Sequence, residues 1–308
     1  RTAAGGEWRF ERGVVAVNEP ANLPDRGMLV IATMPRLDVD AWSDLLAPDT
    51  PPARGARPAA ADDDLRIDEK AYRENLDHWI KDLQLGGLFI AGKQAEFFAM
   101  SVQERKRLIT LSVEAAQAAG DRGGIGRCGI ITSCSDTNLD VVLDLAQHSQ
   151  NIGADYVIVH SPVLHFGADT DETIYEYYRY LSEQLDIGIA LWNHPDCGYV
   201  MSPELCARIA ELPNIVAIKY SVDRALYKRL TEMAGDKIIV STASEEEWLD
   251  NVIELGWRLY LCSTPPFLLQ TAVDQRINGY TQLAFEGKHA EARAMRDSLN
   301  PAREAFKQ

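Results

Sequence analysis

Short apolar runs recur along the chain at nearly even spacing, and they alternate with amphipathic segments. Eight of these runs have the length and the branched side chains of buried strands: residues 27–33, 87–91, 128–132, 155–160, 188–192, 215–219, 237–241 and 258–262. Several intervening segments end in an apolar residue and Gly before the next strand, as in LQLGGLFI and IELGWRLYL. Gly at such a place suits a left-handed turn from a helix back into a sheet.

Eight strand–helix repeats of this size fill the ~250 residues of a parallel (β/α)8 barrel. We therefore predict an α/β fold, the (β/α)8 TIM barrel, over residues 27–282. A doubly wound parallel sheet is the alternative, but no G-x-G-x-x-G follows the first predicted strand.

Three segments lie outside the repeat. Residues 1–26 form an N-terminal segment, and residues 283–308 read as a C-terminal helical extension. Residues 36–66, with APDTPPARGARPAAADDD, are rich in Pro, Ala and charge. This composition predicts an irregular insertion after the first strand, which could serve as a mobile lid.

The charge balance restricts the partners of the chain. The 46 acidic residues outnumber the 31 basic ones and give a net charge of −15, which argues against a nucleic-acid or anionic-membrane surface. No apolar run approaches the ~20 residues of a membrane span. The five cysteines are odd in number and form no C-x-x-C pair, so we expect reduced thiols in a cytoplasmic protein.

A lysine interrupts the apolar run IVAIKYS at residues 215–221. Alternation along a strand places Ile215, Ala217 and Lys219 on the barrel-facing side. The helix-facing side then holds Val216, Ile218 and Tyr220. Lys219 would point inward at the carboxyl end of the sixth strand, where barrel enzymes place their chemistry. Desolvation lowers the pKa of a lysine, and the neutral amine can attack a carbonyl. The alternative is an ammonium that reaches solvent beyond the strand.

Three motifs occur in a fixed order around this lysine: GKQAEF (92–97), WNHPDCG (192–198) and AIKYS (217–221). From about residue 27 to 300 the chain resembles the dihydrodipicolinate synthase/N-acetylneuraminate lyase family of Schiff-base (β/α)8 enzymes. The resemblance implies that Lys219 forms an imine with a small-molecule 2-oxo acid of the pyruvate type. It also implies no cofactor, no metal and a homo-oligomer, either a dimer or a tetramer.

The sequence departs from the family pattern at several site positions. Trp192 stands where the family has its tyrosine, and Trp has one N–H donor and cannot do acid–base work. Lys93 and Gln94 replace the paired threonines, and Cys197 lies near the place of the arginine that synthase members carry. The tyrosine pair expected after the fourth strand becomes SPVLHF (161–166). Diaminopimelate-pathway synthesis is therefore not expected.

The remaining polar residues suggest roles in binding and proton transfer. By the resemblance, Gly92, Lys93 and Gln94 would hold the carboxylate of the 2-oxo acid. His194 is the first candidate for the proton carrier, because its unperturbed pKa near 6.5 suits transfer at neutral pH. His165 and Lys93 are further candidates, and His194 could instead only bond loop backbone.

Aromatic side chains are frequent in the segments expected at the rim of the pocket. They are Phe97, Phe98, Phe166 and Trp192. An aromatic cluster at a mouth suggests a bulky or aromatic substrate partner, although ordinary packing is the favoured explanation for Phe98 and Phe166.

We accordingly predict a Schiff-base-dependent carbon–carbon lyase, an aldolase or hydratase-aldolase, with Lys219 and His194 as catalytic residues. Gly92, Lys93, Gln94, Trp192 and Phe97 are the predicted substrate-binding residues. Three alternatives stay open at this point. One is an imine-forming dehydratase of a sugar acid, and another is a non-catalytic binding protein on the same barrel. The third is a metal-dependent barrel lyase with ligands drawn from Cys134, Asp136, His160 and His194.

Overall fold

The computed structural model describes residues 9–11, 14–16, 28–32, 67–122, 126–162, 170–262 and 269–306. The predicted insertion at 36–66, with its suggested lid role, lies outside these residues, and so do His165 and Phe166. Near the N-terminus, β1 (Arg9–Glu11) and β2 (Val14–Ala16) pair as an antiparallel hairpin.

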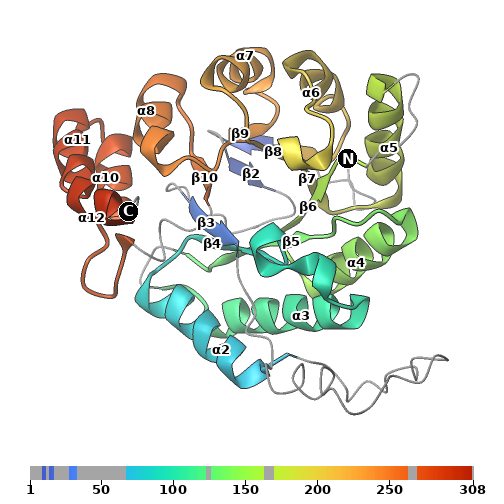
Figure 1. The fold of residues 1–308 in the computed structure, drawn as a ribbon, viewed down its shortest axis with the longest axis horizontal. Coiled ribbons are helices and arrows are strands. Elements are labelled where there is room, and N and C mark those ends of the chain that lie inside the picture. Colours follow the sequence, from blue (N-terminus) through green and yellow to red (C-terminus); the bar gives the residue numbers. More distant parts are fainter. Residues whose placement is uncertain are drawn as a thin grey trace, which may run out of the picture.

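The centre of the molecule is an eight-stranded parallel sheet in the order β10-β3-β4-β5-β6-β7-β8-β9. Its strands are β3 (Met28–Ala32), β4 (Gly87–Ile90), β5 (Gly129–Ser133), β6 (Tyr156–His160), β7 (Gly188–Asn193), β8 (Ile215–Tyr220), β9 (Ile239–Ser241) and β10 (Leu259–Cys262). Each lies within about two residues of a run predicted from the sequence. The prediction of a (β/α)8 barrel is confirmed (Figure 1).

The two edge strands lie beside each other and close the barrel. The backbone N–H of Leu261 in β10 donates to the Ser241 hydroxyl oxygen at the end of β9, over 2.8 Å. The Ser241 side chain thus forms a hydrogen bond that links β9 to β10.

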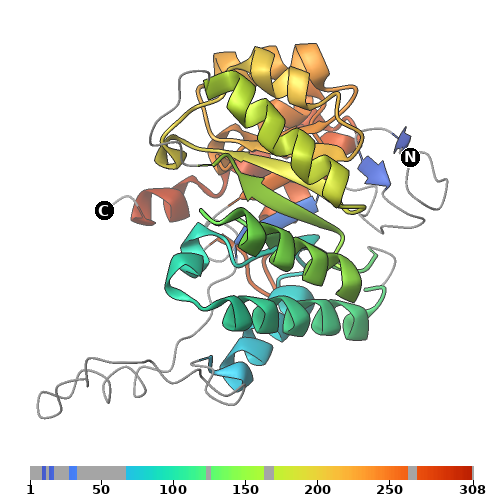
Figure 2. The same ribbon diagram turned by 90° about the vertical axis from the view of Figure 1, so that its right-hand side faces the viewer.

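Helices surround the strands on the outside (Figures 1 and 2). They are α2 (Glu69–Asp77), continued by the π-helical turn η1 (His78–Asp82), α3 (Val102–Ala119), α4 (Leu139–Ile152), α5 (Thr170–Gln184), α6 (Pro203–Ile209), α7 (Arg224–Ala234) and α8 (Glu245–Leu255). The predicted capping box of Ser101 and Glu104 opens α3, and Ser202 caps α6 ahead of Pro203. Among the described residues, no helix is long and apolar enough to cross a bilayer.

The turns from helix to strand use glycine less regularly than the repeat suggests. Gly153 and Gly256 take left-handed conformations, with φ of 85° and 67°, as expected for glycine past a helix end. Before β4, however, the left-handed residue is Gln84, with φ of 50°. Gly188 is already the first residue of β7. The prediction is therefore wrong for these two turns.

A β-bulge in β8 changes which side chains face the barrel interior. Ile189 pairs with Ile215 and Ala190 pairs with Ala217, so Val216 is an extra residue that β7 does not match. Ile215 packs in the cluster shared with the helices, whereas Val216 and Ala217 both belong to the cluster built from strands alone. The predicted facing of Ile215 and Val216 is wrong, because simple alternation fails at a bulge.

Beyond the bulge the alternation resumes. Ala217 belongs to the interior cluster, and Ile218 and Tyr220 pack toward the helices, as predicted. The Tyr220 hydroxyl donates to the Met201 carbonyl at 2.7 Å, which ties the end of β8 to the segment before α6. Lys219 therefore lies on the interior side at the carboxyl end of the strand.

After β10, α10 (Arg276–Phe285) is followed by α11 (His289–Asp297) and α12 (Asn300–Phe306). A buried ion pair joins α12 to the start of α8, where Arg303 binds both carboxylate oxygens of Glu245. The Tyr280 hydroxyl donates to the same carboxylate at 2.8 Å, and the Trp248 indole donates to Thr281 at 2.8 Å. The extension is thus anchored to the barrel by polar contacts as well as by packing.

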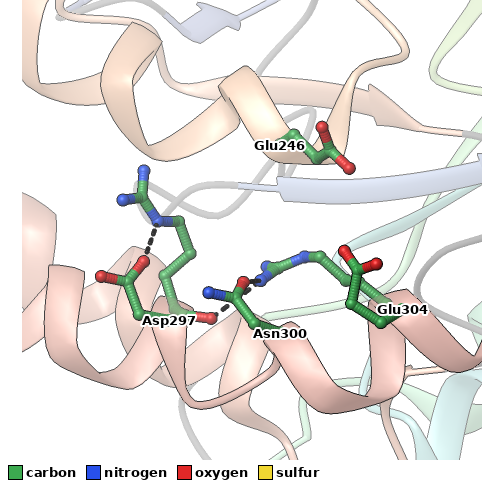
Figure 3. Close-up of a pocket in the computed structure, with 6 residues that line it drawn as sticks. Glu246, Asp297, Asn300 and Glu304 are labelled. Atoms are coloured by element: carbon green, nitrogen blue, oxygen red, sulfur yellow. Dashed lines mark hydrogen bonds and ion pairs between the residues drawn. The ribbon is translucent and has the colours of Figure 1, made fainter.

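A cavity of about 420 Å³ lies between α8 and the extension (Figure 3). Figure 3 shows Glu246 of α8 across from Asp297, Asn300 and Glu304. Its basic groups are already engaged, because Arg296 binds Asp297 and Arg303 binds the Asn300 side-chain oxygen. None of these residues lines the cavity around Lys219 described below.

We predict that Arg303→Met strongly destabilises the protein. The side chains of Arg303 and Glu245 are 9% and 3% exposed, so removing the guanidinium leaves a buried carboxylate without its ion-pair partner. A loss of about 3–5 kcal/mol in the free energy of unfolding is expected from urea denaturation. As a control, Glu232→Gln removes the exposed pair with Lys228 and should leave the midpoint unchanged. Equal effects of the two substitutions would contradict the prediction.

Candidate active site

The Lys219 amine lies beside two aromatic rings at the carboxyl end of the barrel. Its nitrogen is 5.5 Å from the centre of the Phe89 ring and 5.6 Å from that of Trp192. The strand register produces this arrangement, because Trp192 is the partner of Lys219 on β7 and Ser241 is its partner on β9. The lysine is 3% exposed, so most of its surroundings are protein.

The aromatic rings pack edge to face, and a glycine makes room for them. The Phe89 and Trp192 rings have centres 5.5 Å apart and planes at 79°. A Cβ on Gly92 would come within 3.2 Å of the Phe89 ring. Because φ at Gly92 is −77°, the requirement for glycine is one of space and not of backbone conformation. Gly92 therefore supports the ring that faces Lys219.

Two short helical turns follow β4 and carry Lys93 and Gln94. They are η2 (Lys93–Ala95) and η3 (Phe97–Ala99), joined at Glu96 with φ of 53°. The Glu96 backbone N–H donates to the Lys93 carbonyl at 2.9 Å, and its carbonyl accepts from Ala99 at 2.8 Å. Through these backbone bonds Glu96 holds the turn that presents the two polar side chains.

His194 lies directly after β7 and is half-buried. Its carbonyl accepts from the Cys197 N–H at 2.9 Å, which begins the turn η4 (Pro195–Cys197). Burial, followed by the positive charges of Lys93 and Lys219, lowers the pKa of His194 below its ordinary value of 6.5. The lowered pKa favours the neutral imidazole, which can accept a proton.

These groups meet around a cavity of about 370 Å³. It is lined by Lys93, Gln94, Trp192, His194, Lys219, Ser221 and Ala243. Five of the residues singled out from the sequence are thus brought together, and Gly92 lies behind them against Phe89. Ser221 and Ala243 are additions that the sequence interpretation missed. Ser221 follows Lys219 by two residues, and this spacing could have identified it.

Phe97 lies outside the cavity lining. Its ring packs against Phe98 and His160, with centre distances of 5.8 and 6.2 Å. The guanidinium of Arg105 stands 5.0 Å from the centre of the same ring. Phe98 is 70% exposed. In the described part of the chain, Trp192 is therefore the aromatic residue that lines the cavity.

Arg105, on α3, organises the end of β5 and was not singled out from the sequence. It is buried, and it donates to the carbonyls of Ser133 at 3.3 Å and Ser135 at 2.8 Å. It also forms an ion pair with Asp136 at 3.0 Å. An arginine on an amphipathic helix ordinarily faces solvent, so the sequence pattern carries no signal for this role.

The residues considered as metal ligands do not converge. The Cys134 thiol packs against Ser149 at 3.9 Å, and burial raises its pKa to about 11. The His160 Nδ1 donates to the Ser161 carbonyl at 2.8 Å, while Asp136 is paired with Arg105. Over the described ranges, no three His, Cys, Asp or Glu side chains are placed to hold a metal ion.

Fold and site together define a (β/α)8 barrel with a buried lysine and a polar cavity at the carboxyl ends of its strands. The model of the dihydrodipicolinate synthetase family matches residues 55–308. The chain belongs to this family.

Known relatives agree with this assignment. The chain is 29% identical over 196 residues to an uncharacterized DapA-like lyase of Thermococcus onnurineus, which covers 62% of this chain and 63% of that protein. It is 30% identical over 175 residues to a 4-hydroxy-tetrahydrodipicolinate synthase of Hyphomonas neptunium, covering 56% and 55%. The chain thus spans less than two thirds of the length of these relatives.

Solved structures share the fold at lower sequence similarity. One is the chloride-inhibited dihydrodipicolinate synthase of Acinetobacter baumannii complexed with pyruvate. Its TM-score is 0.70 at 19% identity, over 92% of this chain and 84% of that one. At this identity the comparison supports the barrel and says nothing about the substrate.

We predict that Arg105→Met destabilises the protein more than Arg107→Met on the same helix. Arg105 is buried and satisfies two carbonyls and a carboxylate, so its loss should cost about 2–4 kcal/mol in the free energy of unfolding. Arg107 pairs with Glu69 at the surface, and its loss should cost less than about 1 kcal/mol. Urea denaturation of both variants provides the comparison. Similar losses would show that Arg105 does not hold the end of β5.

Proposed function

We propose that this protein is a Schiff-base-dependent carbon–carbon lyase, of the aldolase or hydratase-aldolase type, that acts on a pyruvate-type 2-oxo acid. The observation that carries the proposal is the Lys219 amine, buried beside Phe89 and Trp192 and lining the cavity. An amine that is removed from water loses the hydration that stabilises its charged form, and the neutral form is the nucleophile.

The proposed reaction begins with attack of the Lys219 nitrogen on the 2-oxo carbon. Water leaves, and the protonated imine then draws electrons from the bond at C3, so that a carbon–carbon bond can form or break there. Lys93, the amide of Gln94 and the backbone at Gly92 would hold the carboxylate. The charge of Lys93 favours an anion here despite the net charge of −15.

His194 is the proposed proton carrier. It lines the same cavity as Lys219, and its neutral imidazole can take a proton from C3 and return it. Trp192 occupies the position of the family tyrosine and cannot transfer a proton. Because Trp192 cannot carry the proton and His194 lines the cavity, His194 is a better candidate for the proton carrier than the residues on the outer side of the barrel.

The class of substrate is proposed by analogy with the family. A structural neighbour is complexed with pyruvate, and a relative is named a lyase. Trp192 is the aromatic side chain in the cavity lining that supports an aromatic aldehyde as the second substrate. Phe97 gives no such support, because it packs against Phe98 outside the lining. We include a homo-oligomer and the absence of a cofactor in the proposal, both by analogy with the family.

We predict that Lys219 is the residue trapped when the protein is reduced with borohydride in the presence of pyruvate. Intact-protein mass followed by peptide mapping should place one reduced pyruvyl group on Lys219. Lys219→Ala should show no adduct and no turnover, because alanine lacks the nucleophilic amine. Its thermal midpoint should be unchanged, because the substitution removes a buried amine. Lys93→Ala serves as the control and should still form the adduct, since Lys93 is not the proposed nucleophile. An adduct on Lys93 in the unmodified protein would overturn the assignment.

We predict that the acid limb of the pH–rate profile lies below pH 6.5. Burial and the neighbouring lysines lower the pKa of His194, so the neutral base persists to a lower pH than in an ordinary histidine. The rate of exchange of the pyruvate methyl protons in D₂O, measured from about pH 5 to 8, reports this limb.

Two histidine variants provide the controls. His194→Gln should slow the exchange about 100-fold and remove the limb. His148→Gln should leave the profile unchanged, because His148 bonds Thr110 and Lys106 on the outer helices. A limb that persists in His194→Gln would identify another base.

A further inference from the structure

One buried hydrogen-bond donor in the cavity has no partner in the described part of the protein. The Trp192 residue is 4% exposed, and its indole nitrogen contacts no acceptor there. Trp192 lines the cavity and lies across from Lys219 in the sheet. Leaving a buried N–H unpaired is costly, so its presence beside a cavity suggests an acceptor on the ligand.

Other buried tryptophans show how the chain satisfies this group elsewhere. The Trp248 indole donates to the Thr281 hydroxyl at 2.8 Å, and the Trp257 indole donates to the Thr231 hydroxyl at 3.0 Å. Both lie in the outer layer, where packing between elements determines the partner. Trp192 differs from them in facing the cavity.

A second polar group on the same cavity is also unmatched. The Ser221 hydroxyl is buried without a hydrogen-bond partner in the described residues, and it lies two residues beyond Lys219. The Ser221 backbone donates to the Asn193 carbonyl at 3.1 Å, which holds it next to the end of β7. The residues carrying both donors are therefore fixed by the backbone of adjacent strand ends.

We propose that the Trp192 N–H and the Ser221 O–H form an oxyanion site for the aldehyde oxygen of the carbon–carbon bond-forming step. This inference rests on the proposed function, because the oxygen belongs to the second substrate of the imine reaction. It goes beyond that proposal by assigning a step to a residue that cannot exchange protons.

The proposed step balances without any further reagent. His194 takes a proton from C3 of the imine and leaves an enamine. The enamine C3 attacks the aldehyde carbon, a C–C bond forms, and the carbonyl π electrons move to oxygen as an alkoxide. The indole and the hydroxyl donate hydrogen bonds to that alkoxide, and the His194 imidazolium then returns the proton to it. Water releases the aldol product from Lys219, and cleavage is the reverse.

A donor-only group is suited to this position for an electrostatic reason. Donors aimed at an oxygen stabilise it most when its negative charge develops, and a rigid ring needs little reorganisation. The edge-to-face contact with Phe89 holds the indole in place. Trp192 would therefore lower the barrier of the aldol step more than that of imine formation.

The test separates the two steps in the full-length protein. The methyl exchange of pyruvate in D₂O reports the imine and enamine. Product formation from pyruvate with glyoxylate, D-glyceraldehyde or benzaldehyde, detected by mass spectrometry, reports the aldol step. The variants are Trp192→Phe, which keeps an aromatic ring but removes the donor, Ser221→Ala, and Trp257→Phe as a matched control.

The expected result is a larger change in the aldol step than in the exchange. Trp192→Phe should lower the aldol rate about 100-fold more than it lowers the exchange of pyruvate protons. Ser221→Ala should lower the aldol rate about 10-fold. Trp257→Phe should change neither rate. Thermal midpoints and a borohydride adduct on Lys219 in each variant show that the site is assembled.

Three results would overturn the inference. They are equal losses of exchange and aldol rates in Trp192→Phe, unchanged aldol rates in that variant, and exchange without product from any of the three aldehydes in the unsubstituted protein. A Trp192→Phe variant that fails to assemble is replaced by Trp192→Tyr, which keeps a donor and should retain the aldol rate within about 10-fold. Absence of both exchange and adduct in the unsubstituted protein would instead defeat the proposed function itself.

Discussion

The parallel pairing of β7 with β8 fixes the positions of the groups around the cavity. Trp192 lies next to Lys219 because of this register, and the register depends on the bulge at Val216. Without the extra residue, the interior side of β8 would hold Ile215 in place of Val216, and the chain after it would shift against β7. Val216, the single unmatched residue, lies before the site along β8. It thus determines which residue of β7 lies beside Lys219. Closure of the barrel through Ser241 and Leu261 holds the other side of the same strand end.

The local charge of the site is opposite to that of the whole protein. Lys93 and Lys219 line one cavity in a chain of net charge −15, and both lower the pKa of His194. Their effect is strongest where water is excluded, so a carboxylate can be held there although the surface repels anions. Burial, followed by the same charges, lowers the pKa of His194 and so favours its neutral form.

The sequence predicted the barrel well because the signal repeats eight times, and strands such as β4, β5 and β7 are buried on both faces. It also placed Lys219 at the inner strand end, since alternation is reliable over two residues. It was wrong at Ile215 and Val216 because a bulge has no signature in apolar periodicity. Arg105 was missed because its role depends on contacts between distant segments, and arginine is common at surface positions. Ser221 was missed although it follows Lys219 by two residues, a spacing that could have identified it.

The replacement of a tyrosine by Trp192 separates two tasks that a phenol can combine. A phenol can both donate a hydrogen bond and pass on its proton, whereas an indole can only donate. The proton therefore needs a second carrier, and His194 lies in the same cavity with its pKa lowered toward the neutral form. Its lowered basicity also makes the imidazolium a better acid, which suits the proposed return of a proton to the alkoxide. In the proposed site, Trp192 is a fixed hydrogen-bond donor and His194 is a separate proton carrier. This arrangement is consistent with chemistry at a carbon–carbon bond. It also explains how the site could lack the family tyrosine and still keep a buried lysine.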